Sequence, residues 1–313
     1  MNRLFLGCMI CTILTSSCTK LIKNEDALIE NETQSNTANV QLDRFASKGI
    51  CISTISELQG LWVGSFNANS EYLTKKIVDK GKTAWHTEQK ITIVIDSIQG
   101  SKINGYSIIA GNTKKLIGSL QEDANTFVLQ LTEVGRDFDK GIFTLTIAKS
   151  DSLLRGNWTA GNTIDIPMRN CRFTKKTFSY SPEISFVQIK NIKEDNTIKS
   201  TVSYPSEYDE WYGAVESNYD IVYKVNPSST LLSETDVEGL TKSELMLLRN
   251  TIFARHGYAF KKRPLRIYYE KQPWYVPVSS NPKAGLTTIE QQNIALIVRY
   301  ENNFGQYDAE YGR

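Results

Sequence analysis

Short segments in which apolar and polar residues alternate run through the first half of the chain. Ile91, Ile93 and Ile95 show this spacing, which recurs from Phe127 to Leu131 and from Phe143 to Ile147. Side chains of a strand point alternately to the two faces of a sheet, so a period of two is typical of strands buried on one face. Turn residues separate about eight or nine such segments. We therefore expect residues 46–178 to form an antiparallel β-barrel or sandwich.

A helical pattern replaces this alternation towards the C-terminus. Capping boxes at Thr241–Glu244 and Thr287–Glu290 predict the starts of two helices, and Pro264 stands at the favoured first position of another between them. Gly257 is placed to end the first helix, because glycine readily adopts the left-handed cap conformation. We expect a compact three-helix module over residues 231–301, which makes the fold class α+β (multi-domain).

The segment between these two parts, residues 179–230, is rich in aromatic rings interleaved with carboxylates. These aromatic residues are Tyr204, Tyr208, Trp211, Tyr212, Tyr219 and Tyr223. Such rings suit either a sugar-stacking surface or the cover of a small core, and we favour the second interpretation because tyrosine is so often half-buried. The alternation from Tyr219 to Val225 predicts one edge strand. Residues 302–313 are expected to be a tail.

The N-terminus carries the features of an export signal. Arg3 supplies a positive charge, Leu4–Leu14 an apolar stretch too short to span a bilayer, and Thr15–Ser17 a run of small residues before Cys18. This segment resembles a bacterial lipoprotein signal. The resemblance implies that residues 1–17 are removed, that Cys18 is acylated, and that the protein is anchored to a membrane of the cell envelope. The alternative is an ordinary secretory signal that releases the protein.

Thr19 follows Cys18 in place of the aspartate that retains some lipoproteins in the inner membrane, which favours the outer membrane. The polar residues 18–45 are expected to form a flexible tether, because they cannot bury enough apolar surface to fold. The tether leads into the predicted barrel.

Cysteine usage fits an exported protein. Of the 5 cysteines, Cys8 and Cys11 leave with the signal and Cys18 carries lipid, so Cys51 and Cys171 are left as a pair. In an oxidising compartment they are candidates for one disulfide, with two separate buried thiols as the alternative. The formal net charge of +2 gives no electrostatic case for nucleic acid as a partner.

The helical module resembles the YARHG domain in three stretches, namely Leu247–Gly257, Gln272–Tyr275 and Glu290–Ile294. Nearly all of Leu231–Glu301 follows the pattern of that family, with Phe253 in place of its first tyrosine. The resemblance implies a module of secreted or membrane-tethered bacterial proteins, without implying a reaction. The stretches Gly60–Trp62 and Gly156–Trp158 are similar to the tryptophan-bearing strands of lipocalin-like barrels.

The interior of a barrel of this kind is either filled by its own side chains or just wide enough for one small ligand. We favour a packed core. Ser107, Tyr106 and Gln130 are the polar residues whose inward orientation would favour a ligand cavity.

Two groups of residues are candidates for binding. Arg255, His256, Trp274 and Tyr275 lie in the YARHG-like motif, where the favoured interpretation is that Arg255 and His256, with Arg249, cap carbonyls and stack on the two aromatic rings. The second group is the basic run Lys261, Lys262 and Arg263, which with Arg266 opens the second helix, where the helix dipole disfavours cations. A run of this kind suits an acidic partner such as cell-wall polymer or lipid headgroups, or it simply faces water.

The sequence does not indicate catalytic or metal chemistry. Outside the expected signal it contains no HExxH, paired-cysteine or Gly-X-Ser-X-Gly motif, and His86 is expected to be a surface residue. We expect no cofactor. The favoured function is non-enzymatic binding at the envelope, with cell-wall polymer or another envelope protein as partner. The alternatives are a lipocalin-like carrier of a small apolar ligand, an envelope hydrolase using a carboxylate pair, and a purely structural module that caps the barrel.

Overall fold

The computed structural model describes residues 50–72, 89–135, 140–162, 164, 166–184, 221–283 and 285–311. All of them belong to one compact unit of the chain, Asp43–Arg313. Several predicted features lie outside the described residues: the signal segment with Cys18, the tether, His86, and the aromatic residues from Tyr204 to Tyr219.

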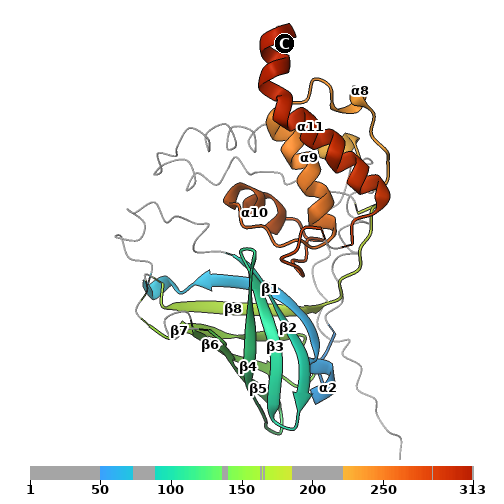
Figure 1. Cartoon of the computed structure of the whole chain (residues 1–313). Coiled ribbons are helices and arrows are strands. Elements are labelled where there is room, and N and C mark those ends of the chain that lie inside the picture. The colour runs from blue at the N-terminus through green and yellow to red at the C-terminus, as the bar shows by residue number, and fades with distance from the viewer. Residues whose placement is uncertain are drawn as a thin grey trace, which may run out of the picture. The chain divides into compact units, whose positions relative to one another are not determined.

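Eight antiparallel strands close into a barrel (Figure 1). The strands are β1 (Gly60–Ala68), β2 (Lys90–Gln99), β3 (Lys102–Ile109), β4 (Asn112–Glu122), β5 (Thr126–Glu133), β6 (Gly141–Ala148), β7 (Leu153–Ala160) and β8 (Met168–Lys176). Each strand pairs with the next, and β1 pairs with β8 to close the ring. A short helix, α2 (Ile55–Leu58), precedes the barrel and a 3-10 turn, η1 (Ser70–Tyr72), follows β1. The predicted antiparallel fold is confirmed, and its closure selects the barrel over the sandwich.

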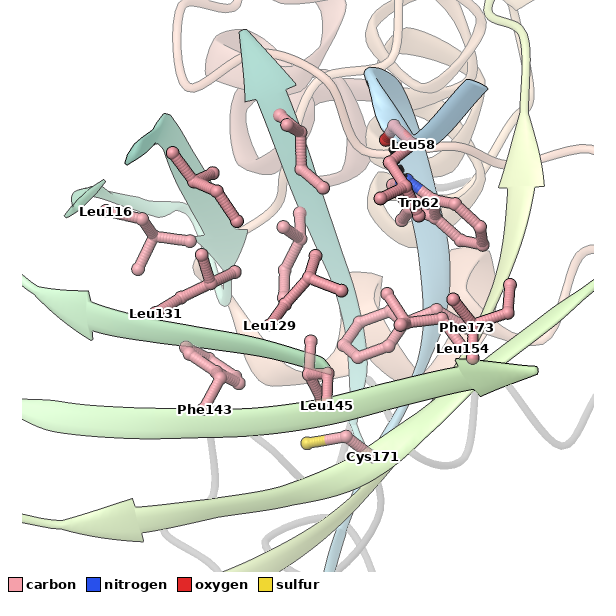
Figure 2. Packing of buried hydrophobic residues seen from close by; sticks show 14 of the residues in the cluster. Leu58, Trp62, Leu116, Leu129, Leu131, Phe143, Leu145, Leu154, Cys171 and Phe173 are labelled. Atoms are coloured by element: carbon pink, nitrogen blue, oxygen red, sulfur yellow. Dashed lines mark hydrogen bonds between the residues drawn. The ribbon is translucent and has the colours of Figure 1, made fainter. Parts of the chain in front are cut away.

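The alternating apolar side chains fill the interior of the barrel. Along β6, burial alternates residue by residue, so that Phe143, Leu145 and Ile147 are buried while their neighbours are exposed. Figure 2 shows Phe143 and Leu145 packed among leucines of the neighbouring strands and Phe173 of β8. The indole of Trp62 donates a 2.8 Å hydrogen bond to the Leu58 carbonyl, which ties α2 to the barrel.

The three polar residues considered for an inward position differ in their surroundings. Ser107 is fully buried and pairs with Ile93, so it shares the inner face with that isoleucine. Tyr106 is half-buried and Gln130 is exposed. Only Ser107 among them therefore has its side chain in the core.

The expected disulfide between Cys51 and Cys171 is not present, and this corrects the sequence analysis. The alternation of β8 turns Cys171 to the same inner face as Phe173, and both belong to the barrel core (Figure 2). Cys51, by contrast, is exposed. Burial raises the pKa of the Cys171 thiol to about 12, although nearby Arg169 opposes the shift. Counting cysteines took no account of the face of the strand to which Cys171 belongs.

The C-terminal part is helical. It comprises α7 (Ile221–Lys224), α8 (Glu234–Val237), α9 (Lys242–Arg255), α10 (Arg263–Glu270) and α11 (Thr288–Tyr311). Helices α9 and α11 pack side by side (Figure 1). Of the described helices, none is both long enough and apolar enough to cross a membrane.

The two predicted capping boxes form, and the predicted terminal glycine of α9 adopts the expected conformation. The Thr241 hydroxyl accepts a 3.2 Å hydrogen bond from the Glu244 amide, while the Glu244 carboxylate accepts one of 2.8 Å from the Thr241 amide. The second capping box, Thr287 with Glu290, closes in the same reciprocal way. Gly257 has a φ of 68° directly after the C-cap of α9, the left-handed conformation expected of it. The starts of α9 and α11 were therefore predicted correctly, whereas α10 begins at Arg263, one residue before Pro264.

One local prediction was wrong. The segment expected to be an edge strand from Tyr219 to Val225 contains helix α7 instead. Ile221 and Val222 are adjacent and both buried, which a strand with one buried face cannot achieve but a helical turn can. Helix α11 continues to Tyr311, so residues 302–311 of the expected tail are helical.

One row of outward-facing barrel residues is buried as deeply as the core. Val63 pairs with Thr92, and Thr92 with Ile108, so the three form a continuous row across β1, β2 and β3. Their exposed fractions are 7%, 0% and 1%. Thr113, the next partner of Ile108, donates a 3.4 Å hydrogen bond to Ser280 of the helical part. The helical part therefore lies against the outer face of the barrel along this row.

Candidate functional site

The carboxylate of Glu290 is the centre of a buried polar cluster at the YARHG-like motif. Its Oε2 atom accepts a 2.9 Å hydrogen bond from the Thr287 amide and lies 2.7 Å from His256 Nε2. Its Oε1 atom accepts a 3.0 Å hydrogen bond from the Tyr180 hydroxyl. The Glu290 side chain is fully buried, and that of His256 is only 8% exposed. One carboxylate thus gathers donors from three parts of the chain.

Local structure explains how these side chains meet. His256 is the C-cap of α9, and Gly257 follows it in the left-handed conformation that turns the chain away. Glu290 is the third residue of α11 and closes the capping box with Thr287. Tyr180 comes from the segment that leaves β8, and its ring stacks on the His256 ring with 4.2 Å between centroids.

Burial and hydrogen bonds set the ionisation of the cluster. Burial by itself raises the pKa of Glu290, but the donors from Thr287 and His256 outweigh it and bring the pKa below its ordinary value. For Tyr180, burial and the negative charge of Glu290 act together and raise the pKa to about 12. The phenol therefore stays protonated at neutral pH and donates its hydrogen bond to an ionised carboxylate.

Arg255, the residue before His256, joins two further segments. Its Nη1 atom donates a 2.5 Å hydrogen bond to Asn226 Oδ1, and its Nη2 atom donates one of 3.2 Å to the Ile184 carbonyl. Asn226 in turn donates to the Pro182 carbonyl at 2.9 Å. Burial lowers the pKa of Arg255. The arginine is only 3% exposed, so it holds the chain leaving the barrel to the start of the helical part.

Arg249, Arg255 and His256 were expected to cap carbonyls and to stack on Trp274 or Tyr275. Of these contacts, the structure shows the bond of Arg255 to the Ile184 carbonyl. Arg249 forms an ion pair with Glu301, through its Nε atom at 3.0 Å. His256 stacks on Tyr180, not on the expected Trp274 or Tyr275. Trp274 and Tyr275 are buried in the helical core instead, and the Tyr275 hydroxyl donates to the Tyr258 carbonyl at 2.7 Å.

The basic run at the start of α10 separates into exposed and buried residues. Lys261 and Lys262 are exposed, and Arg263 is the first residue of the helix. Arg266 is 6% exposed and donates a 2.9 Å hydrogen bond to Glu270 one turn later. A Cβ atom added at Gly111 of the barrel would lie 2.3 Å from Lys261 Cγ, so the stem of this lysine rests against the turn between β3 and β4.

Two residues of the polar network were not singled out by the sequence analysis. Tyr180 precedes the helical pattern and has no spacing that marks it. Asn293 falls within the motif stretch Glu290–Ile294, but its partners are distant in sequence. Its Oδ1 atom accepts from the Leu232 amide at 2.8 Å, and its Nδ2 atom donates to the carbonyls of Pro227 and Thr230 at 2.8 and 2.7 Å.

The chemistry of this arrangement is that of a buried hydrogen-bond network centred on one carboxylate. The Tyr180 hydroxyl donates to the Glu290 carboxylate. His256 is held between this carboxylate and the Tyr180 ring. Within the described ranges, no three histidine, cysteine, aspartate or glutamate side chains gather closely enough to hold a metal ion. The residues brought together are those that join α9, α11 and the segment after the barrel.

Residues 219–302 match the YARHG domain. The protein therefore consists of an eight-stranded antiparallel barrel followed by a YARHG domain, which begins before the residue 231 expected from the sequence. No curated protein matches the chain. A solved structure similar to the chain is that of apo Caenorhabditis elegans lipid binding protein 8, at 14% identity and a TM-score of 0.24. The match covers 40% of this chain and 99% of that one.

Proposed function

We propose that this protein is a lipid-anchored protein of the cell envelope that binds an acidic envelope polymer without catalysing a reaction. The observation that carries the proposal is the exposure of Lys261 and Lys262, beside motif residues that are themselves buried. Arg255, Trp274 and Tyr275 maintain the fold, whereas the two lysines present their charge to solvent. The lipoprotein-like N-terminus with Cys18 supports the envelope as the location.

The position of the two lysines supports a binding role. Cations at the start of a helix are disfavoured by its dipole, so Lys261 and Lys262 oppose a local rule at the N-terminus of α10. Local conflicts of this kind are expected at functional surfaces. The stem of Lys261 also rests on the barrel turn at Gly111, which restricts its movement before any partner binds. Two adjacent exposed ammonium groups suit the carboxylates or phosphates of an acidic polymer.

Cosedimentation with purified cell-wall sacculi tests this proposal. We expect the full-length variant Lys261→Glu with Lys262→Glu to bind roughly 10-fold more weakly, because each reversed charge changes the interaction by about 1 kcal/mol at most. Binding by the wild type should weaken as salt is raised.

The control replaces Lys242 and Lys283, which are also exposed, by glutamate and so makes the same change in net charge. Binding by this control variant should stay near the wild-type level. The proposal is abandoned if the Lys261 and Lys262 variant pellets as well as the wild type. Equal losses in both variants would assign the binding to net charge and not to this surface.

A further inference from the structure

The turn after α10 holds an amine that belongs to the barrel. Lys90 is the first residue of β2, and its Nζ atom donates hydrogen bonds to the carbonyls of Gln272 at 3.2 Å and Tyr275 at 3.0 Å. The same Nζ atom lies 5.5 Å from the centroid of the Tyr275 ring. The residues that surround the amine, Gln272–Tyr275, are one of the three stretches that define the resemblance to the YARHG domain.

The turn is built from buried and internally bonded groups. Gln272 and Tyr275 are 0% and 2% exposed. The Gln272 amide donates to the Tyr269 carbonyl at 2.9 Å, and the Tyr275 amide donates to the Gln272 carbonyl at 3.2 Å. The Tyr275 ring is held by its own hydroxyl, which donates to the Tyr258 carbonyl. The two carbonyls and the ring face are therefore in place whether or not an amine lies between them.

A carboxylate completes the surroundings of Lys90. Glu270 Oε2 accepts a 3.0 Å hydrogen bond from the backbone amide of Lys90, while its Oε1 atom accepts from Arg266 Nε at 2.9 Å. Carbonyl oxygens, the face of an aromatic ring and a carboxylate all carry negative potential. No element of this set favours an anion, and the hydrogen-bond acceptors require a ligand that donates hydrogen bonds, which an ammonium group does while also matching the negative potential.

Burial lowers the pKa of Lys90 to about 8, while the charge of Glu270 opposes this shift and that of Lys176 adds to it. The amine is therefore mainly charged at neutral pH and becomes neutral in mildly alkaline solution. Either form has enough N–H groups to serve both carbonyls. The chemical class that fits the turn is accordingly a primary amine.

We propose that the Gln272–Tyr275 turn of the YARHG domain is a binding site for primary amines, filled in this protein by the Lys90 side chain of the barrel. Its natural ligand is thus the end of a lysine side chain. This recognition fastens the helical part to the barrel at β2, next to the buried outer row that contains Thr92.

Chemical rescue of a Lys90→Ala variant tests the site. The substitution removes three carbons and the amine, which is the shape of n-propylammonium. We expect the melting temperature of the full-length variant to fall by about 5 °C, because the buried Tyr275 carbonyl loses its donor and the Gln272 carbonyl keeps only the Tyr275 amide. Millimolar n-propylammonium should then raise it again in a saturable way, as expected of a ligand that binds the folded state.

Three controls separate amine binding from other effects. Tetramethylammonium has the same charge but no N–H group, so it should not rescue Lys90→Ala. Lys90→Met fills the space of the stem, so it should be destabilised and should not respond to propylammonium. Lys102→Ala removes an exposed lysine of the barrel, on β3, and should show neither the loss nor the rescue.

The proposal is overturned if Lys90→Ala melts at the wild-type temperature, or if propylammonium acts equally on Lys90→Ala and Lys90→Met. Equal rescue by tetramethylammonium would also overturn it, because the effect would then be one of charge alone. If Lys90→Ala does not fold by itself, the yield of folded protein after refolding with propylammonium or with tetramethylammonium provides the same comparison.

Discussion

Glu290 connects three segments of the protein through a single side chain, and its charge is central to that role. Replacing Glu290 by glutamine keeps the shape but places an amide beside groups that already donate, namely the Thr287 amide, the Tyr180 hydroxyl and His256 Nε2. We expect Glu290→Gln to lower the free energy of unfolding by about 2 kcal/mol at neutral pH, since hydrogen bonds to a charged group are lost. Chemical denaturation followed by circular dichroism measures this difference.

The same variant carries a pH signature. The pKa of Glu290 in the folded protein lies below the ordinary value of 4.5, so its stabilising effect is present above that pH and disappears as the pH falls through the folded value. The difference between wild type and Glu290→Gln should therefore shrink as the pH falls below 4.5. A difference that is constant with pH would show that the charge of Glu290 is not what stabilises the cluster.

At the level of single residues, the sequence predicted the roles of only some members of this cluster. The position of Glu290 in a capping box was readable because Thr287 lies three residues away. The contact with His256 and the hydrogen bond from Tyr180 were not readable, since 34 and 110 residues separate these partners. Hydrogen bonds between neighbouring residues can be predicted from their spacing in the sequence, whereas those between distant segments cannot.

Among the secondary-structure elements, α9 offers a direct test of how a helix ends. Gly257 has a φ of 68°, and a Cβ atom added there would lie 2.5 Å from a Val278 methyl and 2.8 Å from the Val276 carbonyl oxygen. We expect Gly257→Ala to lower the free energy of unfolding by about 3 kcal/mol, from left-handed strain and steric overlap together. Urea denaturation measures the change.

Gly239 provides the matched control, because its φ of 80° is similar but an added Cβ would meet nothing within 4 Å. Gly239→Ala should cost about 1 kcal/mol, the contribution of backbone strain alone. Equal losses in the two variants would mean that the contacts of Gly257 with Val276 and Val278 are unimportant.

The elements differ in how well their patterns predicted them. Strands such as β6 were recognised because burial on one face imposes a strict alternation. Helix α9 was recognised from its capping box and its terminal glycine. The stretch Ile221–Val222 was assigned to a strand because its surroundings alternate weakly, whereas the structure buries both residues in the helical core. Seven residues of weak pattern do not distinguish a strand from one turn of helix.

For the whole molecule, the proposed lipid anchor makes a prediction about where the protein is found. Cys18→Ser removes the thiol that would carry lipid, and buried acyl chains hold a protein on a membrane by about 0.8 kcal/mol per methylene. We expect this variant to move from the membrane pellet to the soluble fraction after cell lysis and ultracentrifugation, followed by immunoblotting.

Cys51→Ser serves as the control, since Cys51 is exposed and lies outside the expected signal. It should remain in the membrane pellet with the wild type. If Cys18→Ser also stays in the pellet, the lipid anchor is rejected and attachment through another part of the protein has to be sought.

The sequence by itself determined the kinds of elements, most of their starts and the presence of a YARHG domain in the C-terminal part. These features depend on residues within a few positions of one another, such as Thr241 with Glu244. The spacing of such residues can be read directly from the sequence. The tertiary structure alone decided that the strands close into a barrel, that Cys171 faces the core and that Lys90 reaches the Gln272–Tyr275 turn. Each of these depends on which faces of distant segments meet, and that is settled by the packing of the whole chain.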